Sequence, residues 1–282
     1  MIFLILSVLS STAIFVLFKL FNKHNVNTLQ AIVYNYITAS TCGLLLYQKP
    51  IQLNYFISEP WFYVALALGF LFIAIFNVMA LTAQKNGLSV ASVASKMSVI
   101  IPVLFGIIIY KESVGFYKIL GIILALAAVV LASIKPKSNV RLTRSIYLPI
   151  VLFLGSGIIE TSVNHFAPDG NMPLFLSIIF ASAGIIGFAL VGLKSVKTKQ
   201  RFNRKSIPFG IALGLVNYSS MYFLLKALRV EGFETSSVFT INNVAIVAMT
   251  CLIGLLVFKE LISYKNWLGI GLALISIVLV IL

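Results

Sequence analysis

Lys96 and Glu160 are ionisable residues in the middle of long apolar stretches, where such side chains are rare. An ammonium or a carboxylate in hydrocarbon is costly unless it faces water, a ligand or an opposite charge. At about 1.5 Å rise per residue, their helices would place Glu160 roughly 21 Å and Lys96 roughly 13 Å from the same membrane face. Side chains of this length can meet or share one cavity. We therefore predict that both flank a substrate site; a structural ion pair and snorkelling of Lys96 are the alternatives.

Small polar residues accompany both charges at helical spacing. Ser156 and Asn164 share the face of Glu160, and Ser92 shares the face of Lys96, six residues before Pro102. A buried carboxyl could hold a proton and exchange it when substrate binds, which would couple transport to protons. Pro102 removes one helical hydrogen bond and is expected to bend its helix towards the cavity.

Neutral amides and hydroxyls in other apolar stretches are further candidate ligands for a polar solute. They are Asn35, Asn77, Asn217, Tyr218, Thr240, Asn242 and Asn243. Each could equally form an interhelical hydrogen bond, which is worth about 0.6 to 2 kcal/mol in a membrane. For any single one of them, the interhelical bond is the preferred interpretation.

The elements that must position these side chains are membrane-spanning helices. Sixty per cent of the 282 residues are hydrophobic, 10% are charged and the mean hydropathy is +1.07. Apolar runs of about 20 residues, the length that crosses a bilayer as a helix, follow one another along the chain. We predict an all-α polytopic membrane protein with ten transmembrane helices, near 1–21, 29–48, 61–83, 88–110, 116–134, 146–166, 172–193, 207–229, 235–258 and 264–282.

An internal repeat divides this series into two halves. The segment 106–121 returns as 254–269, displaced by 148 positions, and each copy contains a Lys-Glu pair followed by a glycine. Upstream, Gly87 recurs as Gly232, displaced by 145 positions. Five helices per half is an odd number, so the halves would insert from opposite sides as an inverted repeat, which favours alternating access.

The expected units are a first five-helix repeat over 1–134, a basic connecting loop over 135–145 and a second repeat over 146–282. Gly121 and Gly269 begin small-xxx-small patterns at matching positions of the fifth and tenth helices. Such patterns allow close backbone contact, so these two helices are expected to pack together.

The net charge of +14 lies mainly at the ends of the apolar runs. Loops on one side carry fifteen Lys and Arg residues and those on the other side carry five. We predict an integral protein of the plasma (inner) membrane, and this asymmetry places both termini outside the cytoplasm. It also makes nucleic acid an improbable partner.

The repeated pattern resembles the drug/metabolite transporter superfamily, in its ten-helix members built from two EamA-type units. Pro102 and Gly106 are followed by Glu112 and Gly121, and the second copy has Glu260 and Gly269. Asn35 stands where the family often has an arginine. The resemblance implies uptake or efflux of a small solute by alternating access, with no fixed substrate.

Two other function classes remain open at this point. A lipid-headgroup flippase would use the same helices with a lateral opening. An integral-membrane enzyme is disfavoured, because seven acidic residues and two histidines offer no nucleophile–base or metal set. We expect no cofactor and no metal. The expected partners are a small-molecule substrate, the lipid bilayer and protons, with monomer and homodimer both open.

Overall fold

The computed structural model describes residues 1–49, 57–111, 115–133, 147–198, 202–232, 234–259 and 263–281. Within these ranges all regular structure is helical and there is no strand. The expected connecting loop 135–145, together with Glu112 and Glu260 of the repeated Lys-Glu pairs, lies outside the described residues.

The observed helices follow the predicted ranges closely. They are α1 (Ile2–Lys23), α2 (Thr28–Leu46), α4 (Pro60–Lys85), α5 (Leu88–Lys96), the 3₁₀ turn η1 (Met97–Val99), α6 (Ile100–Ile109), α7 (Phe116–Ser133), α8 (Tyr147–Phe166), α9 (Met172–Thr198), α10 (Ser206–Leu228), α11 (Thr235–Leu256) and α12 (Tyr264–Ile281). Eight helical segments are long and apolar enough to cross a membrane, and α5, η1 and α6 together form one of them. The prediction of an all-helical membrane protein is confirmed at this level. α7 and α12 are two further apolar helices.

Local sequence explains several helix starts. The Asn27 side chain accepts a hydrogen bond from the Gln30 backbone N–H at 3.1 Å and caps α2. Pro60 is the first residue of α4, where its missing N–H costs nothing. Gly87 precedes α5 with φ of 104°, a conformation that favours glycine.

The fourth predicted helix is interrupted where the proline was expected to act. Three residues, Met97–Val99, form a 3₁₀ turn between α5 and α6. Pro102 cannot donate a hydrogen bond to the Ser98 carbonyl one turn earlier, which weakens the helix there. The Ser98 hydroxyl bonds back to the Ser95 carbonyl. The interruption therefore begins directly after Lys96.

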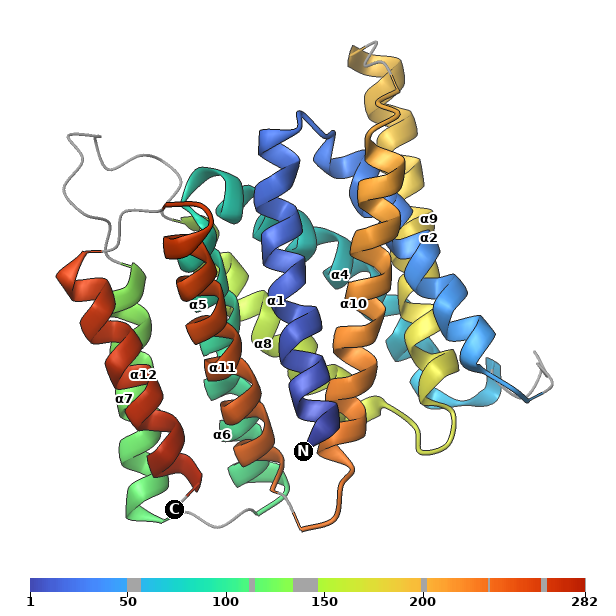
Figure 1. The fold of residues 1–282 in the computed structure, drawn as a ribbon. Coiled ribbons are helices and arrows are strands. Elements are labelled where there is room, and N and C mark those ends of the chain that lie inside the picture. Colours follow the sequence, from blue (N-terminus) through green and yellow to red (C-terminus); the bar gives the residue numbers. More distant parts are fainter. Residues whose placement is uncertain are drawn as a thin grey trace.

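The helices form one bundle with both chain termini at the same end (Figure 1). We call this the termini end; the opposite end carries the α9–α10 connection. α1 and α2 both pack against α10, and in the same way α8 and α9 both pack against α4. α2 also pairs with α9, and α7 with α12 at one edge of the bundle, as the matched glycines predicted.

Left-handed backbone conformations recur along the described chain at the spacing of the sequence repeat. Asn25 and Gly170 have φ of 54° and 79°, and Gly87 and Gly232 have φ of 104° and 86°. Both pairs are 145 positions apart. Lys111 and Lys259, with φ of 54° and 51°, are 148 positions apart. These six are all the positive-φ residues in the described ranges.

Two glycines bring α8 close to the first part of the chain. A Cβ atom at Gly155 would collide with the side chain of Ile75 on α4, and one at Gly157 would collide with Ile101 on α6. A larger residue at either position would require these isoleucine side chains to shift. The close contact places Ser156 and Glu160 of α8 beside α5.

Candidate functional site

A cavity of about 70 Å³ lies at mid-depth between α1, α4, α5, α8 and α10. At about 30 Å³ of liquid volume per water, it has room for about two water molecules. The residues that line it are Ser11, Ile14, Phe15, Phe72, Ile75, Phe76, Met79, Ser95, Lys96, Ser156, Ile159, Glu160, Asn217, Ser220, Met221 and Leu224. The cavity therefore combines charged, hydrogen-bonding and aromatic walls.

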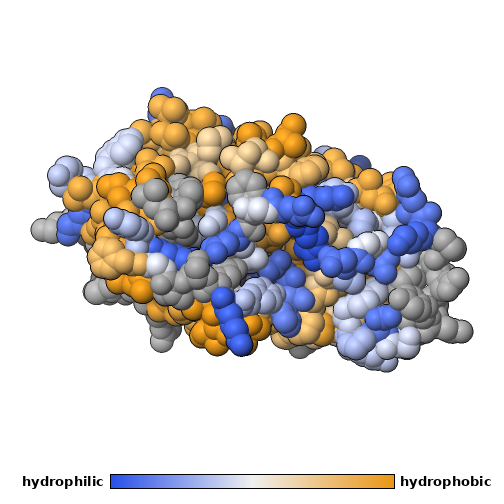
Figure 2. Space-filling view, turned by 90° about the horizontal axis from the view of Figure 1, so that it is seen from below, coloured by the Kyte–Doolittle hydropathy of each residue, from blue (hydrophilic) through white to orange (hydrophobic). Residues whose placement is uncertain are grey.

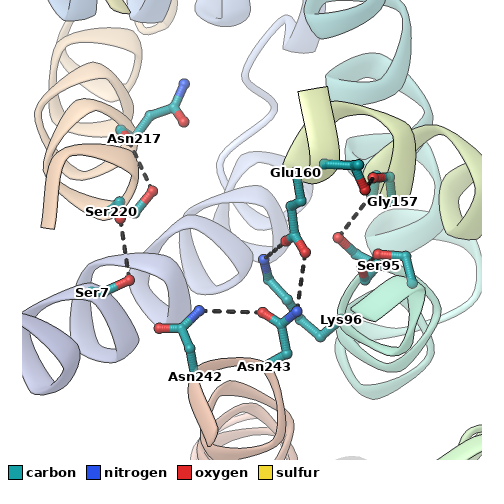
Figure 3. A network of polar contacts seen from close by, with 12 residues as sticks. Ser7, Ser95, Lys96, Gly157, Glu160, Asn217, Ser220, Asn242 and Asn243 are labelled. Carbon is teal, nitrogen blue, oxygen red and sulfur yellow. Dashed lines mark hydrogen bonds and ion pairs between the residues drawn. The ribbon is translucent and has the colours of Figure 1, made fainter. Parts of the chain in front are cut away.

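Lys96 and Glu160 meet at this cavity. The Lys96 Nζ lies 2.7 Å from the Glu160 Oε1, and the two side chains are 12% and 7% exposed (Figure 3). Both charges are thus almost removed from bulk solvent. Breaking a buried pair of this kind is far more costly than breaking one at a surface. Lys96 comes from α5 and Glu160 from α8, so the ion pair connects the first half of the sequence to the second.

The second carboxylate oxygen is bound by α11. Asn243 donates its amide to Glu160 Oε2 at 3.0 Å, and Asn242 donates to the Asn243 side-chain oxygen at 3.2 Å (Figure 3). Both asparagines are fully buried. The Asn242 side-chain oxygen has no hydrogen-bond partner among the described residues. Glu160 is therefore held by a cation on one side and a neutral amide on the other.

Hydroxyl pairs reinforce the same three-helix contact. The Ser95 and Ser156 hydroxyls are 3.0 Å apart, next to the ion pair, and join α5 to α8. The Thr250 hydroxyl donates to the Ser92 hydroxyl at 2.7 Å and joins α11 to α5. Ser92 in turn donates to the Ser89 carbonyl. Each of these serine and threonine hydroxyls therefore has a hydrogen-bond partner.

On the opposite side of the cavity, polar contacts connect α10 to α1 and α2. The amides of Asn217 and Asn35 are in contact at 3.1 Å, with both residues buried. Ser220 donates to the Asn217 carbonyl at 2.8 Å, and Ser7 donates to the Ser220 carbonyl at 3.1 Å (Figure 3). These bonds hold the polar wall of α10 in place.

The structure groups only part of the predicted site residues. Lys96, Glu160, Ser156 and Asn217 line the cavity. Three others are one or two hydrogen bonds away, namely Asn35, Asn243 and Asn242. The remaining five lie elsewhere: Ser92, Asn77, Asn164, Tyr218 and Thr240.

Ser92 is bonded to Thr250 of α11, and three of the other four have local or apolar surroundings. Asn77 donates to the Ile73 carbonyl of its own helix at 2.7 Å. Tyr218 stacks with Tyr222, and its hydroxyl has no partner among the described residues. Thr240 borders a separate small apolar pocket beside α6 and α7. Helical spacing gave the correct face for Ser156 but also selected Asn164, one turn beyond the cavity.

Several cavity residues were not predicted as ligands. Ser11 and Ser95 line it, as do the aromatic rings of Phe15, Phe72 and Phe76. A signal existed for Ser11, because Ser7, Ser11 and Phe15 repeat at four-residue spacing on α1. The phenylalanines give no such signal, because apolar residues surround them throughout the sequence.

Among the described residues, no group of three His, Cys, Asp or Glu side chains is close enough to hold a metal ion. The site instead offers an ion pair, amides, hydroxyls and an apolar wall. This set suits reversible binding of a solute that carries both polar and apolar groups.

Comparison with known proteins places this arrangement in a family. A family model described as the EamA-like transporter family matches residues 1–134. A Haemophilus influenzae protein, described as an uncharacterized protein, is 32% identical over 285 residues, covering 97% of this chain and 95% of the relative. A protein of known crystal structure that is 13% identical to this chain superposes with a TM-score of 0.64 over 98% of both chains, which shows that the fold is shared. The chain belongs to the EamA-like transporter family.

Proposed function

We propose that this membrane transporter moves a small amphipathic solute by alternating access, with the cavity between α1, α4, α5, α8 and α10 as its binding site. The observation that carries the proposal is the Lys96–Glu160 ion pair. It joins the two halves of the chain across a mid-depth cavity, at 2.7 Å. Ionisable residues inside a membrane bundle typically mark substrate or ion pathways.

The proposed architecture is ten membrane-spanning helices in two inverted five-helix repeats, over 1–134 and 146–282. The main helix contacts support it, because they are unchanged when α1, α2, α4 and α7 are exchanged for α8, α9, α10 and α12. The paired left-handed residues at 145 and 148 positions support the same register. A binding site between inverted halves can face either side as the halves rock.

The chemistry of the cavity favours a solute with a polar group and an apolar portion. Lys96 and Glu160 provide one positive and one negative charge, and Asn217 provides an amide. Phe72 and Phe76 on α4 provide apolar surface on another wall. A solute that enters must replace the ion pair with contacts of its own, because leaving either charge buried alone is costly.

Proton coupling is a narrower part of the proposal. Glu160 is the acidic residue that lines the cavity, and carboxylates inside a membrane bundle commonly belong to proton relays. Substrate and proton would then compete for the same carboxylate.

We further propose that both termini face away from the cytoplasm in the plasma membrane. Both lie at the same end of the bundle. The basic connections near Lys23, Lys85, Lys194 and Lys205 belong to the opposite end, and positive loops remain on the cytoplasmic side.

The test is uptake into proteoliposomes of a panel of radiolabelled amino acids, compared with flipping of lipid-linked sugars. We expect a water-soluble solute to be moved and Glu160→Gln to lower its kcat/KM by about tenfold or more, equal to about 1.4 kcal/mol of lost stabilisation. Glu234→Gln is the matched control, because this carboxylate pairs with Lys118 away from the cavity.

Three outcomes would count against parts of the proposal. Movement of lipid-linked sugars alone would favour a flippase. Equal losses in Glu160→Gln and Glu234→Gln would remove the reason for placing the site at the cavity. Full activity of Glu160→Gln with an unchanged pH dependence would end the proton-coupling hypothesis.

A further inference from the structure

The turn between α1 and α2 and the turn between α8 and α9 occupy equivalent places in the proposed repeat. We call residues 24–27 the first corner and residues 167–171 the second corner. Asn25 and Gly170, 145 positions apart, give both corners a left-handed residue. The first corner lies opposite the termini end, and the second corner lies at the termini end (Figure 1).

Arg229, at the end of α10, holds the second corner by charged hydrogen bonds. Its Nε donates to Asp169 Oδ1 at 2.8 Å and its Nη2 donates to the Ala167 carbonyl at 2.8 Å. A guanidinium that binds a carboxylate and a carbonyl together fixes their relative position in the plane of its donors. We call Arg229, Asp169 and Ala167 the ionic latch.

Gln84, at the end of α4, holds the start of α2 directly after the first corner by a neutral bond. Its Nε2 donates to the Thr28 hydroxyl at 2.8 Å. Gln84 and Arg229 are 145 positions apart, the spacing that also relates Gly87 to Gly232. Equivalent positions therefore fasten the two ends of the bundle with different chemistry. We call Gln84 and Thr28 the neutral latch.

The ionic latch connects two helices that enclose the cavity, and the neutral latch connects one of them, α4, to α2. The ionic latch ties the end of α10 to the end of α8, and these helices contribute Ser220 and Glu160 to the cavity. The neutral latch ties the end of α4, which contributes Phe76 to the cavity, to the first residue of α2. A solute that leaves between such helices has to pass where their ends are fastened.

We propose that the ionic latch controls opening of the cavity at the termini end and the neutral latch controls opening at the opposite end, so that the termini end, which is fastened by an ion pair, responds more strongly to ionic strength. The proposal rests on alternating access through this cavity. Asp169 is 90% exposed and Arg229 is 28% exposed, so salt reaches and screens this pair. An amide–hydroxyl bond carries no net charge and is not screened in this way.

The end face itself offers the right surroundings for a salt-dependent latch. Figure 2 looks onto the termini end, where hydrophilic side chains gather in a band between apolar flanks. Lys49 donates to the Gly170 carbonyl at 3.4 Å and brings a second cation to the second corner. Lys226 is exposed one turn before Arg229, and its ammonium lies 5.6 Å from the Tyr222 ring centroid.

The experiment uses a cysteine reporter in the cavity. Met221 lines the cavity and is replaced in a chain that also carries Cys42→Ser and Cys251→Ser, so that Met221→Cys is the single thiol. Proteoliposomes of known orientation are treated with a membrane-impermeant maleimide from either side. The labelling rate from each end measures how often the cavity opens there.

We expect Arg229→Gln, which copies the residue at position 84, to raise labelling from the termini end about fivefold, the upper range for an exposed ion pair. Raising NaCl from about 0.05 to about 0.5 M should have a similar effect on the unmodified latch and little effect on Arg229→Gln. Gln84→Leu should raise labelling from the opposite end only, without salt dependence. Lys226→Gln, which removes the same charge one turn away, should leave both rates unchanged.

The outcomes separate this proposal from the transport proposal. A reporter that reacts from one end only, or from neither, in the unmodified chain contradicts alternating access and the latches with it. A reporter that reacts from both ends, with no change in Arg229→Gln or a change that Lys226→Gln reproduces, overturns the ionic latch alone. The salt titration needs no substitution at Arg229, so it decides the question even if Arg229→Gln does not fold.

Discussion

The interrupted segment α5–η1–α6 and the continuous helix α11 approach Glu160 from two sides with different chemistry. Lys96 of α5 pairs with one carboxylate oxygen, and Asn243 of α11 donates to the other. Pro102 in α6 and Thr250 in α11 are 148 positions apart, the spacing of the sequence repeat. Pro102 has no backbone N–H to donate, whereas Thr250 keeps its backbone N–H and adds a side-chain hydroxyl.

This difference shows how two similar segments can divide the work at one site. Pro102 leaves a 3₁₀ turn directly after Lys96, a local deviation from regular helix. The Thr250 hydroxyl lies 2.8 Å from the Ile246 carbonyl oxygen and 2.7 Å from the Ser92 hydroxyl, within an unbroken helix, and can donate to either. We call α5–η1–α6, which carries Lys96, the charged arm, and α11, which carries Asn243, the amide arm. We infer that the charged arm is the one that adapts its shape and that the amide arm is fixed.

The largest expected effect comes from breaking the charged arm. Lys96→Met leaves Glu160 buried without its cation and should lower the free energy of unfolding by about 3 to 5 kcal/mol. The double variant Lys96→Met/Glu160→Gln removes both charges and should recover most of that loss. Reversible unfolding in mixed micelles measures both. A double variant as unstable as the single one would show that the ion pair itself, rather than the stranded charge, sets the cost.

The amide arm should contribute less. Asn243→Leu removes one charge-assisted hydrogen bond and should cost about 1 to 2 kcal/mol in the same unfolding assay. Asn242→Leu is the matched control, because its side-chain oxygen has no described partner and its amide reaches Glu160 only through Asn243. Equal costs for the two substitutions would contradict the proposed division between Lys96 and Asn243.

The smallest effect is expected at the contact between the two arms. Thr250→Val keeps the shape of the side chain and removes its bond to Ser92, at a cost of about 0.6 kcal/mol. Thr250→Ser retains the hydroxyl and should be nearly neutral. A loss in Thr250→Ser as large as that in Thr250→Val would assign the role of this residue to its methyl group.

Most of the helix pattern could be predicted because it depends on local composition. Runs such as Ile2–Lys23 and Leu88–Ile109 are apolar over the length of a bilayer, and their ends coincide with polar residues or glycine. The repeat spacing was also visible, and the left-handed residues Asn25 and Gly170 extend it to turns that show no sequence identity.

The site could be predicted only for residues that are unusual in an apolar segment. Lys96 and Glu160 were identified by their charge and Ser156 by its spacing from Glu160. Ser95 and Phe72 were not identified, because serine and phenylalanine are common in such helices. The positions of Asn164 and Tyr218 relative to the cavity depend on how the helices are rotated about their axes, which no single helix specifies.

The sequence by itself determined an all-helical membrane chain, the spacing of its repeat and the two charges that are costly to bury. Only the tertiary structure decided that these charges neutralise each other at 2.7 Å, and that Asn243 rather than Asn164 completes the contacts of the carboxylate. The physical reason is that hydrophobic length and charge are properties of one segment, whereas an ion pair depends on the rotation and spacing of two helices. Those are set by packing at positions such as Gly155 and Gly157, where the absence of a side chain lets α8 approach its neighbours.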